Sequence, residues 1–164
     1  MFVSEALDER HDLDAFDSGA PDLDDWLQRS ARRSDAKRQG RTYVWHGGDR
    51  VAVAYFTLAP HVIQRTELPG RLSRGDLHQV PALLLARLAV DRRLQGQGLG
   101  AELLIDAMGR AVAASSQVGG RYVVVDARDE VAGHFYEHHG FQRCHTEQSR
   151  RYARKVSDIA ISLG

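Results

Sequence analysis

Apolar side chains recur with helical spacing in three segments of the chain. The first follows Asp22, a residue suited to cap a helix, and the second covers residues 101–115. The third follows Asp129, another capping residue, and is closed by Gly140. Each spacing predicts an amphipathic helix. The residues expected on the buried sides are Leu23, Trp26, Leu27 and Ala31; Leu103, Leu104, Ala107, Met108, Ala111 and Val112; and Val131 and Phe135.

Shorter apolar runs predict strands, and a His-Gly-Gly-Asp turn between the first two predicts a β-hairpin. Residues 60–80 contain prolines and glycines and predict an irregular excursion. Strand, loop, helix, strand and helix follow one another in the middle of the chain. The sequence therefore predicts an α/β (α+β) layered fold in a single domain over residues 1–164. The predicted strands cover residues 42–45, 51–58, 82–90, 122–125, 141–144 and 159–163.

Composition narrows the class of protein. Apolar residues make up 43 % of the chain, enough for one core, and 22 Lys+Arg balance 22 Asp+Glu. The zero net charge excludes a generally polybasic binder, and a single cysteine, Cys144, excludes a disulfide framework or a cysteine-based zinc cluster. The N-terminus lacks a signal-peptide pattern, and the longest apolar run, 51–60, is too short to span a bilayer. We expect a cytoplasmic protein that needs no metal and no membrane.

Charges of opposite sign are segregated along the chain. Residues 1–26 hold nine acids and one base, and two basic groups follow. Such groups either form solvated faces or bind a polyanion such as RNA, and charge alone leaves both interpretations open. The basic groups are Arg29, Arg32, Arg33, Lys37, Arg38 and Arg41, and Arg143, Arg150, Arg151, Arg154 and Lys155.

Three glycines, Gly96, Gly98 and Gly100, lie between a predicted buried strand and a predicted helix. Glycine lets the backbone approach a ligand, and the first N–H groups of a helix lack internal partners. The segment therefore predicts a phosphate cradle rather than a plain connection. Gly96-x-Gly98-x-x-Ala101 also fits a dinucleotide-binding fingerprint, with Asp126 as the ribose ligand. The polar segment 91–95 before the first glycine and the short chain after Asp126 count against that alternative.

The segment Leu88–Gly100 resembles the acetyl-CoA loop of the GNAT N-acetyltransferase superfamily, whose Gln/Arg-x-x-Gly-x-Gly/Ala signature is matched by Gln95, Gly98 and Gly100. Residues 134–141 resemble the aromatic-Tyr-x-x-x-Gly-Phe segment of the same family. The resemblance implies a mixed, splayed central sheet flanked by helices, with acetyl-CoA as co-substrate. It implies contacts to acetyl-CoA from Leu88, Ala89, Val90, Gln95, Gly96, Gln97, Gly98, Leu99, Gly100, Ala101 and Phe135.

A narrower resemblance extends into the N-terminal half. Residues 16–19, 23–27, 41–44, 86–91 and 126–129 are similar to the GNAT toxins of toxin–antitoxin modules. Those toxins acetylate the amino group of aminoacyl-tRNA, are neutralised by a ribbon-helix-helix antitoxin and often form dimers. The resemblance thus implies RNA contacts from the basic groups, and Arg87 either faces the acceptor or is a buried arginine paired with an acid. The substrate-binding candidates are Arg29, Arg32, Arg33, Lys37, Arg38, Arg87, Arg150 and Arg151, with Arg154 beside them.

Acetyl transfer from a thioester to an amine requires a proton for the departing thiolate. Tyr136 is the natural donor, because a phenol with a pKa near ~10 can protonate a thiolate whose reference pKa is near ~8.5. No base stands out among His134, His138, His139, Asp126 and Glu102. A lysine amine, near ~10.4, needs a base more than an α-amine near ~7.7–8.0 does. This difference favours an aminoacyl ester as acceptor. A small-molecule or protein amine, and a non-catalytic acyl-CoA-binding or nucleic-acid-binding module, are the alternatives.

Overall fold

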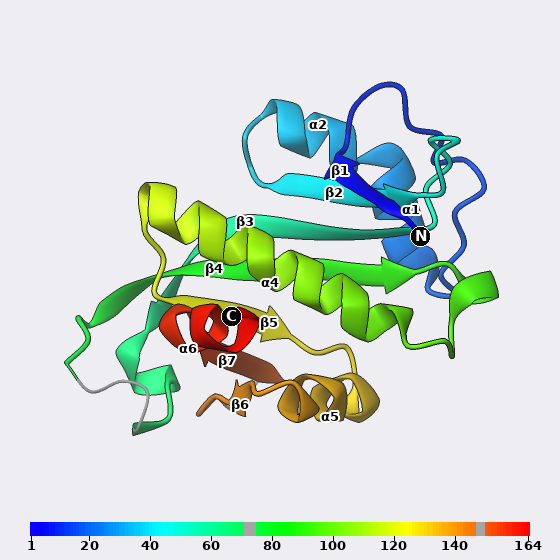
Figure 1. Ribbon diagram of the computed structural model, residues 1–164. Coiled ribbons are helices and arrows are strands. Elements are labelled where there is room, and N and C mark those ends of the chain that lie inside the picture. Colours follow the sequence, from blue (N-terminus) through cyan, green and yellow to red (C-terminus); the bar gives the residue numbers. More distant parts are fainter. Residues whose placement is uncertain (71–74, 147–149) are drawn as a thin grey trace. The chain divides into compact units, whose positions relative to one another are not determined.

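The computed structural model describes residues 1–70, 75–146 and 150–164, and these divide into two compact units (Figure 1). Unit 1 comprises Met1–Ala59 and Ala86–Ala107, and unit 2 comprises Pro60–Leu85 and Met108–Gly164. Part of the excursion predicted over residues 60–80 falls at 71–74, outside the described residues. No helix in the described ranges is long and apolar enough to cross a membrane.

Unit 1 is built on a sheet in which β1 (Val3–Ala6), β2 (Arg41–His46), β3 (Ala54–Gln64) and β4 (Gln79–Val90) lie in that order. The β1–β2 and β2–β3 pairs are antiparallel, and Tyr43 lies opposite Phe56. The predicted hairpin is therefore confirmed. Its second strand starts at Ala54 rather than at residue 51 and continues to Gln64.

Neighbouring residues of β2 show how helices cover both faces of this sheet. Val44 packs with Leu27 and Ala31 of helices α1 (Pro21–Arg29) and α2 (Ala31–Ala36). Trp45 points to the opposite face, where its Nε1 donates to Asp106 of α4 (Leu99–Val118) at 2.8 Å. The unit is thus a three-layer structure of helix, sheet and helix.

Helix α1 begins earlier than predicted. Asp22 was expected at the N-cap, but Ala20 occupies that position and Pro21 is the first helical residue. Proline suits this place because its missing N–H would have no intrahelical partner there. Helix α1 ends at Arg29, and Ser30 separates it from α2. Ala31, which is predicted in the same helix as Trp26 and Leu27, therefore begins α2 instead.

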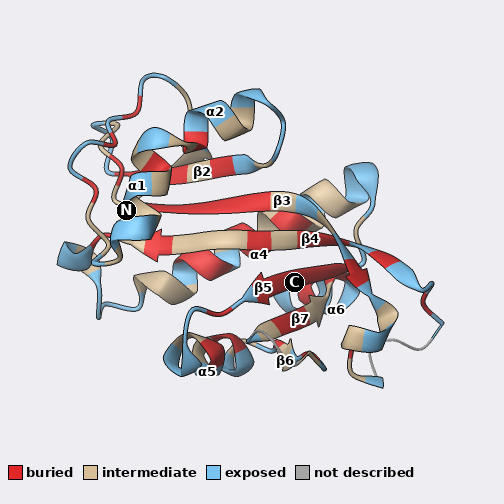
Figure 2. Ribbon diagram, turned by 180° about the vertical axis from the view of Figure 1, so that it is seen from behind, coloured by how far each residue is buried: buried red, intermediate tan, exposed pale blue. Residues whose placement is uncertain are grey.

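Unit 2 places β5 (Tyr122–Asp126) parallel to β4 at Ala82–Leu84 and antiparallel to β7 (Arg151–Lys155), with β6 (Gln142–Arg143) at the edge. The helices α5 (Glu130–His138) and α6 (Val156–Leu163) pack against β7. Figure 2 shows how completely β5 is buried. Short 3₁₀ turns cover Arg65–Glu67 and Arg92–Leu94. The core includes Ile63, Leu68, Val80, Ala82, Tyr122, Val124, Cys144 and Ala153.

The mixed sheet flanked by helices confirms the predicted fold class. The strand predicted over 159–163 is wrong, because that segment belongs to α6. Its β-branched residues favour a strand by propensity, but Val156 and Ile159 are buried three positions apart, which is helical spacing.

The predicted buried face of α5 is also wrong. Val131 is 79 % exposed and Phe135 is half-buried, whereas Gly133 and Tyr136 face the core. An added Cβ at Gly133 would lie 2.4 Å from the Tyr152 hydroxyl oxygen. Glycine at this position therefore lets α5 approach β7 closely, and this contact sets the rotation of the helix.

Candidate functional site

The predicted glycine loop connects the end of β4 to α4 within unit 1. Gly96 and Gly98 have φ angles of +79° and +80°, in the left-handed region that favours glycine. Beyond its chain neighbours, an added Cβ at Gly96, Gly98 or Gly100 would meet no atom within 4 Å, and residues 95–98 are exposed. The loop backbone therefore faces open space in which a ligand has room to bind.

The buried Asp91 and the exposed Gln95 fix the start of this loop. The Asp91 carboxylate accepts hydrogen bonds from N and Nε of Arg93 at 3.0 and 2.9 Å and from Asp17 N at 3.2 Å. Burial raises the pKa of Asp91, but these bonds outweigh burial and hold the pKa below its ordinary value. The side chain of Gln95 donates to Ser18 O and Val90 O, each at 2.8 Å. Both amide protons of Gln95 thus stabilise the loop itself.

Helix α4 begins directly after the loop. Glu102 N donates to Gly98 O at 3.4 Å, so the N–H groups of Leu99, Gly100 and Ala101 precede this bond and lack intrahelical acceptors. They also lie at the positive end of the helix dipole. Together with Gln97 and the glycines, these groups form an arrangement suited to a phosphate or pyrophosphate.

Strand β4 leads into this cradle. Ala89 is buried in the core of unit 1, while Leu88 and Val90 are half-buried and point to the opposite face of the strand. Asp91 N donates to Val53 O at 2.8 Å, just beyond the strand. The backbone segment 88–90, which the resemblance places in contact with acetyl-CoA, therefore belongs to the same unit as the cradle.

Arg87 lies one residue before that segment and stacks on an aromatic ring. Its guanidinium carbon is 3.6 Å from the centroid of the Trp26 ring, and Trp26 stacks on Tyr55 with centroids 6.3 Å apart. Among the described residues Arg87 forms no ion pair. Burial lowers the pKa of Arg87, and the charges of Tyr55 and Asp22 act in the opposite direction. Sequence reasoning assigned Trp26 to the core stripe and missed this contact, because no sequence spacing connects α1 with β4.

Tyr136 lies in unit 2, where it is 7 % exposed. Its ring contacts Phe135 and Phe141 edge-on, with centroids 5.3 and 5.6 Å away. Burial raises the pKa of Tyr136 to about 12, so the phenol keeps its proton throughout the physiological range. A protonated phenol is the form that a proton donor to a departing thiolate requires.

None of the candidate bases gains an environment that favours proton abstraction. His134, His138 and Glu102 are exposed. Burial, followed by the charges of neighbouring cations, lowers the pKa of half-buried His139. Asp126 is held by Arg151 through two hydrogen bonds at 2.8 and 3.0 Å. The site therefore favours an acceptor amine that is already neutral.

Basic residues of α1, α2, the turn after α2 and the start of β2 form what we call the helical cluster: Arg29, Arg33, Lys37, Arg38 and Arg41. All five are exposed, and among the described residues none of them forms an ion pair. Within the cluster, Arg33 donates to the nearby Arg29 O at 3.0 Å. Arg32 differs because its guanidinium reaches the N-terminal segment, where it donates to Asp8 O at 3.2 Å and to His11 O at 2.6 Å. Its predicted substrate contact stays a prediction, and we leave it out of the helical cluster.

The C-terminal basic residues Arg143, Arg150 and Arg151, here called the strand cluster, are paired with acids. Arg150 Nε lies 2.9 Å and Arg143 Nη1 3.8 Å from Glu130 Oε1, and the bond from Arg150 lowers the pKa of Glu130. Arg151 bridges Asp126 and Glu67 and is 19 % exposed at its side chain. Its predicted RNA contact is therefore disfavoured, and Arg150 is partly neutralised.

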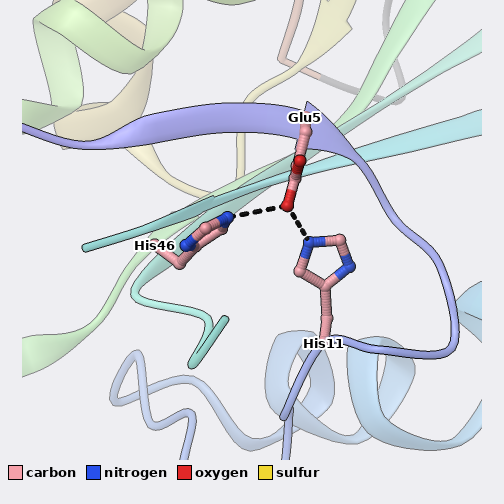
Figure 3. A group of neighbouring side chains, drawn as sticks. All are labelled: Glu5, His11 and His46. Atoms are coloured by element: carbon pink, nitrogen blue, oxygen red, sulfur yellow. Dashed lines mark hydrogen bonds and ion pairs between the residues drawn. The ribbon is translucent and has the colours of Figure 1, made fainter. Parts of the chain in front are cut away.

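Glu5, His11 and His46 form a buried polar group with the spacing of metal ligands (Figure 3). The Glu5 Oε1 atom lies 2.8 Å from His11 Nε2 and 2.7 Å from His46 Nε2. On the other side of each ring, Nδ1 accepts a backbone N–H, from Asp8 and from Gly48. In a neutral imidazole Nε2 must then carry the proton and donate to Glu5. A metal would need those Nε2 lone pairs, so the bonding favours a hydrogen-bond network over a metal site.

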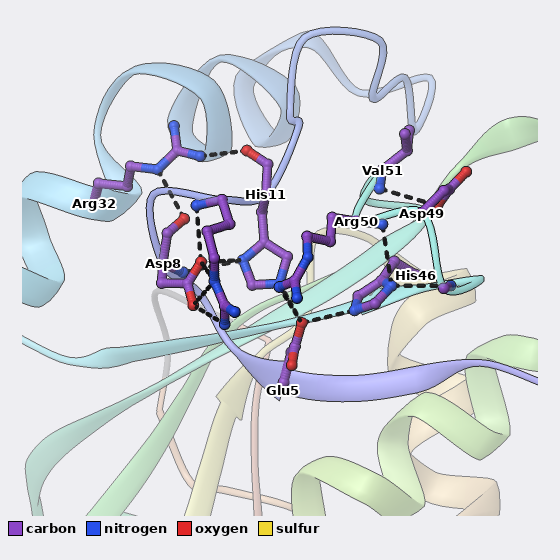
Figure 4. A network of polar contacts seen from close by, with 10 residues as sticks. Glu5, Asp8, His11, Arg32, His46, Asp49, Arg50 and Val51 are labelled. Carbon is purple, nitrogen blue, oxygen red and sulfur yellow. Dashed lines mark hydrogen bonds and ion pairs between the residues drawn. The ribbon is translucent and has the colours of Figure 1, made fainter.

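This network is also connected to α2 (Figure 4). Arg32 reaches from that helix to the carbonyl of His11, so the N-terminal segment, β2 and α2 are joined by one set of polar contacts. Two bonds from the histidines lower the pKa of Glu5. The network therefore acts as a brace for α2, the helix that carries Arg33 of the helical cluster.

Comparisons with known proteins agree with the chemistry of this arrangement. Residues 38–143 match the family model described as acetyltransferase (GNAT) domain. A tRNA-acetylating toxin of Mycobacterium tuberculosis is 39 % identical over 136 residues, which cover 83 % of this chain and 81 % of that protein.

Solved structures extend the similarity to the whole chain. AtaT complexed with acetyl-methionyl-tRNAfMet superposes with a TM-score of 0.90 at 29 % identity and covers 100 % of both chains. A Tyr-to-Phe variant of AtaT, bound to the C-terminus of the antitoxin AtaR and to acetyl-CoA, gives a TM-score of 0.83 at 28 % identity. That similarity covers 99 % of this chain and 98 % of the other.

Proposed function

The chain belongs to the GNAT acetyltransferase family, and on that basis we propose that it transfers the acetyl group of acetyl-CoA to the α-amine of an aminoacyl-tRNA. An aminoacyl-tRNA with an acetylated amine cannot accept a growing peptide, so the reaction blocks translation. We further propose that residues 1–164 act as one N-acetyltransferase domain and that the protein works in the cytoplasm, where charged tRNA is made.

The observation that carries the proposal is the helical cluster, five exposed cations that form no ion pair in the described chain, of which Arg41 alone acts on an acid, Asp35. These cations belong to the same unit as the phosphate cradle. Exposed, unpaired cations attract a polyanion, whereas a small amine or a lysine side chain gains nothing from them. The similarity to a tRNA-acetylating toxin supports the same acceptor.

For the donor, we assign the pyrophosphate of acetyl-CoA to the loop. The backbone N–H groups of residues 97–101 hold the two phosphates at the α4 N-terminus, and the left-handed glycines keep the loop open toward them. A backbone N–H of segment 88–90 polarises the thioester carbonyl as charge develops on its oxygen. Phe135 supplies an apolar contact to the donor.

For the transfer itself, the neutral α-amine attacks the thioester carbon. A C–N bond forms, the C–S bond breaks, and the electron pair leaves with sulfur. Tyr136 gives its phenolic proton to the thiolate, and the nitrogen releases its extra proton to solvent, from which Tyr136 is reprotonated. An α-amine is substantially neutral near pH 8, since its reference pKa is ~7.7–8.0, so this scheme needs no strong base.

Incubation with acetyl-CoA and total charged tRNA tests the function. We expect N-acetyl-aminoacyl-tRNA to form, detected by mass after nuclease digestion to aminoacyl-adenosine. A lysine peptide and free amino acids in parallel reactions serve as competing acceptors. Transfer to those amines and not to charged tRNA would support the alternative of a small-molecule or protein acetyltransferase. Binding of acetyl-CoA without transfer to any acceptor would leave a non-catalytic binding module.

The comparisons also support partners. Because AtaT binds the antitoxin AtaR, we propose that a ribbon-helix-helix antitoxin neutralises this protein. A homodimer remains a prediction from the resemblance. Expression of the chain alone and together with a neighbouring antitoxin gene should give growth arrest and rescue, respectively.

A further inference from the structure

Arg87 and Trp26 form a stacked pair that the transfer chemistry above does not use. The guanidinium lies 3.6 Å from the centroid of the indole ring, and Trp26 is held in turn by Tyr55, whose ring plane is inclined by only 11°. The Tyr55 hydroxyl donates to Leu23 O at 2.7 Å, which fixes that ring. A stacked guanidinium keeps its N–H donors at its edges available for a planar, bidentate contact.

The charge of Arg87 is only partly compensated within the chain. The guanidinium is half-buried and stacked on Trp26, and the described residues form no ion pair with it. The charges of Tyr55 and Asp22 favour its charged form, but burial outweighs them. Desolvated charges are normally paired, because burial without a partner is costly. Other partly buried arginines of this protein follow that rule, since Arg151 is paired with both Asp126 and Glu67. The missing partner of Arg87 is therefore an anion brought by a ligand.

The position of Arg87 indicates which ligand. Residues two apart on a strand share a face, so Arg87 lies on the same face of β4 as Ala89. Ala89 packs with Leu27 of α1 and Ala31 of α2, the helices that carry Arg29 and Arg33 of the helical cluster. Beyond Ala89 the same strand leads to the donor cradle. An RNA bound on the helical cluster would therefore bring its 3′ end to the face that carries Arg87.

We propose that Arg87, stacked on Trp26, binds the phosphate immediately 5′ of the aminoacylated terminal adenosine. This inference rests on the proposed function. The amino acid, ester and ribose of the acceptor end carry no negative charge, so that phosphate is the nearest anion to the reacting amine. Arginine binds phosphate through two parallel N–H···O bonds. Arg87 is in this view a positioning residue that orients the acceptor and does not touch the reacting atoms.

Two short acceptors test the inference, aminoacyl-adenosine with and without a 5′-phosphate. For the wild-type protein we expect kcat/KM to be about 10–100-fold higher with the phosphate, the effect of one charge-assisted contact. Arg87→Ala should bring this ratio close to one. Arg87→Lys keeps the charge but loses the planar pair of N–H donors, so it should give an intermediate ratio. The matched control Arg143→Ala should retain the wild-type ratio, because Arg143 already pairs with Glu130.

A wild-type ratio near one, or an unchanged ratio in Arg87→Ala, would overturn the assignment while leaving the proposed function intact. Absence of transfer by the wild-type protein to either fragment and to charged tRNA would instead overturn the proposed function. Calorimetry with amide-linked, unreactive analogues of the two fragments gives the same ratio as dissociation constants. Calorimetry therefore tests the contact between Arg87 and the phosphate without any turnover. Circular dichroism confirms that each variant is folded.

Discussion

The helical cluster of unit 1 and the strand cluster of unit 2 each gather several basic residues within a short stretch of sequence, but their surroundings differ. The five side chains of the helical cluster are exposed and unpaired within the described chain. In the strand cluster, Arg143 and Arg150 share Glu130, and Arg151 joins Asp126 to Glu67. A cation already paired with an acid has less to gain from a phosphate. We therefore propose that the helical cluster binds RNA and that the strand cluster stabilises the structure.

The largest effect should come from removing the proposed proton donor, which belongs to neither cluster. Tyr136→Phe deletes the proposed proton donor but keeps the buried ring, so turnover should fall by about 10²–10⁴-fold. Dissociation constants for acetyl-CoA and charged tRNA should stay at the wild-type values. Stopped-flow turnover and equilibrium binding separate the two quantities, and undiminished turnover would remove Tyr136 from the mechanism.

The pH dependence of the wild-type protein provides a second view of Tyr136. Because burial raises its pKa to about 12, the phenol loses its proton only as the pH rises toward that value. We expect kcat/KM to rise up to about pH 8, as the α-amine with a reference pKa of ~7.7–8.0 becomes neutral, and then to stay level to about pH 10. A falling limb near neutral pH would contradict the assignment of this buried phenol as the acid.

Matched double variants test the difference between the clusters directly. Arg33→Gln/Lys37→Gln and Arg143→Gln/Arg150→Gln each remove two positive charges. The first should raise KM for charged tRNA about tenfold. It should also reduce the slope of log binding constant against log salt concentration by roughly 0.7–0.9 for each lost phosphate contact. The second should change KM less than twofold. Equal effects from both variants would show that ion pairing with Glu130 does not decide which cluster binds RNA.

For the stability of the fold, a substitution in the strand cluster should have a larger effect than one in the helical cluster. Arg151→Gln leaves Asp126 and Glu67 without their shared cation, so we expect a loss of about 1–3 kcal/mol in the free energy of unfolding. Arg29→Gln removes an exposed, unpaired charge and should change the free energy of unfolding by less than about 0.5 kcal/mol. Urea unfolding of the two variants measures both values. A destabilising Arg29→Gln would mean that the helical cluster is structural as well.

The smallest effect concerns the hydrogen-bond network of Glu5, His11 and His46, which is connected to α2. Hydrogen bonds from His11 and His46 lower the pKa of Glu5, so its contribution to stability is complete above pH 4.5, the ordinary value for glutamate. That contribution should be lost as the pH falls through the lowered pKa in the folded state. Thermal unfolding between pH 3 and pH 6 should show a smaller acid dependence for Glu5→Gln than for the wild-type protein. Identical profiles would show that Glu5 does not titrate in this network.

Local features of the fold could be predicted from the sequence, whereas pairing over long distances could not. The glycine loop, the helix after it and the Asp129 cap of α5 depend on residues within a few positions of one another. Asp129 does accept the Ala132 N–H, at 2.8 Å. In contrast, Arg151 pairs with a glutamate 84 positions away. The face of α5 depends on Tyr152, and no local pattern reveals either contact.

The same distinction holds for the candidate site. The backbone cradle is a property of glycine spacing, so residues 95–101 could be predicted as one group. The roles of individual cations could not, because Arg32 and Arg33 are neighbours in sequence, yet Arg32 bonds to the distant carbonyls of Asp8 and His11 whereas Arg33 bonds only within its own helical segment, to Arg29 O. Trp26 has helical spacing with Leu23 and therefore reads as core. Only the packing of α1 against β4 reveals its contact with Arg87.

The most direct test of the central claim is a single-turnover reaction of the wild-type protein with labelled acetyl-CoA, a charged tRNA and the same tRNA without its amino acid. We predict that label appears on the amine of the charged tRNA alone and that the rate falls steeply as salt is raised. Label on neither tRNA, while a lysine peptide or a small amine is acetylated in the same tube, would contradict an RNA acceptor recruited by unpaired cations.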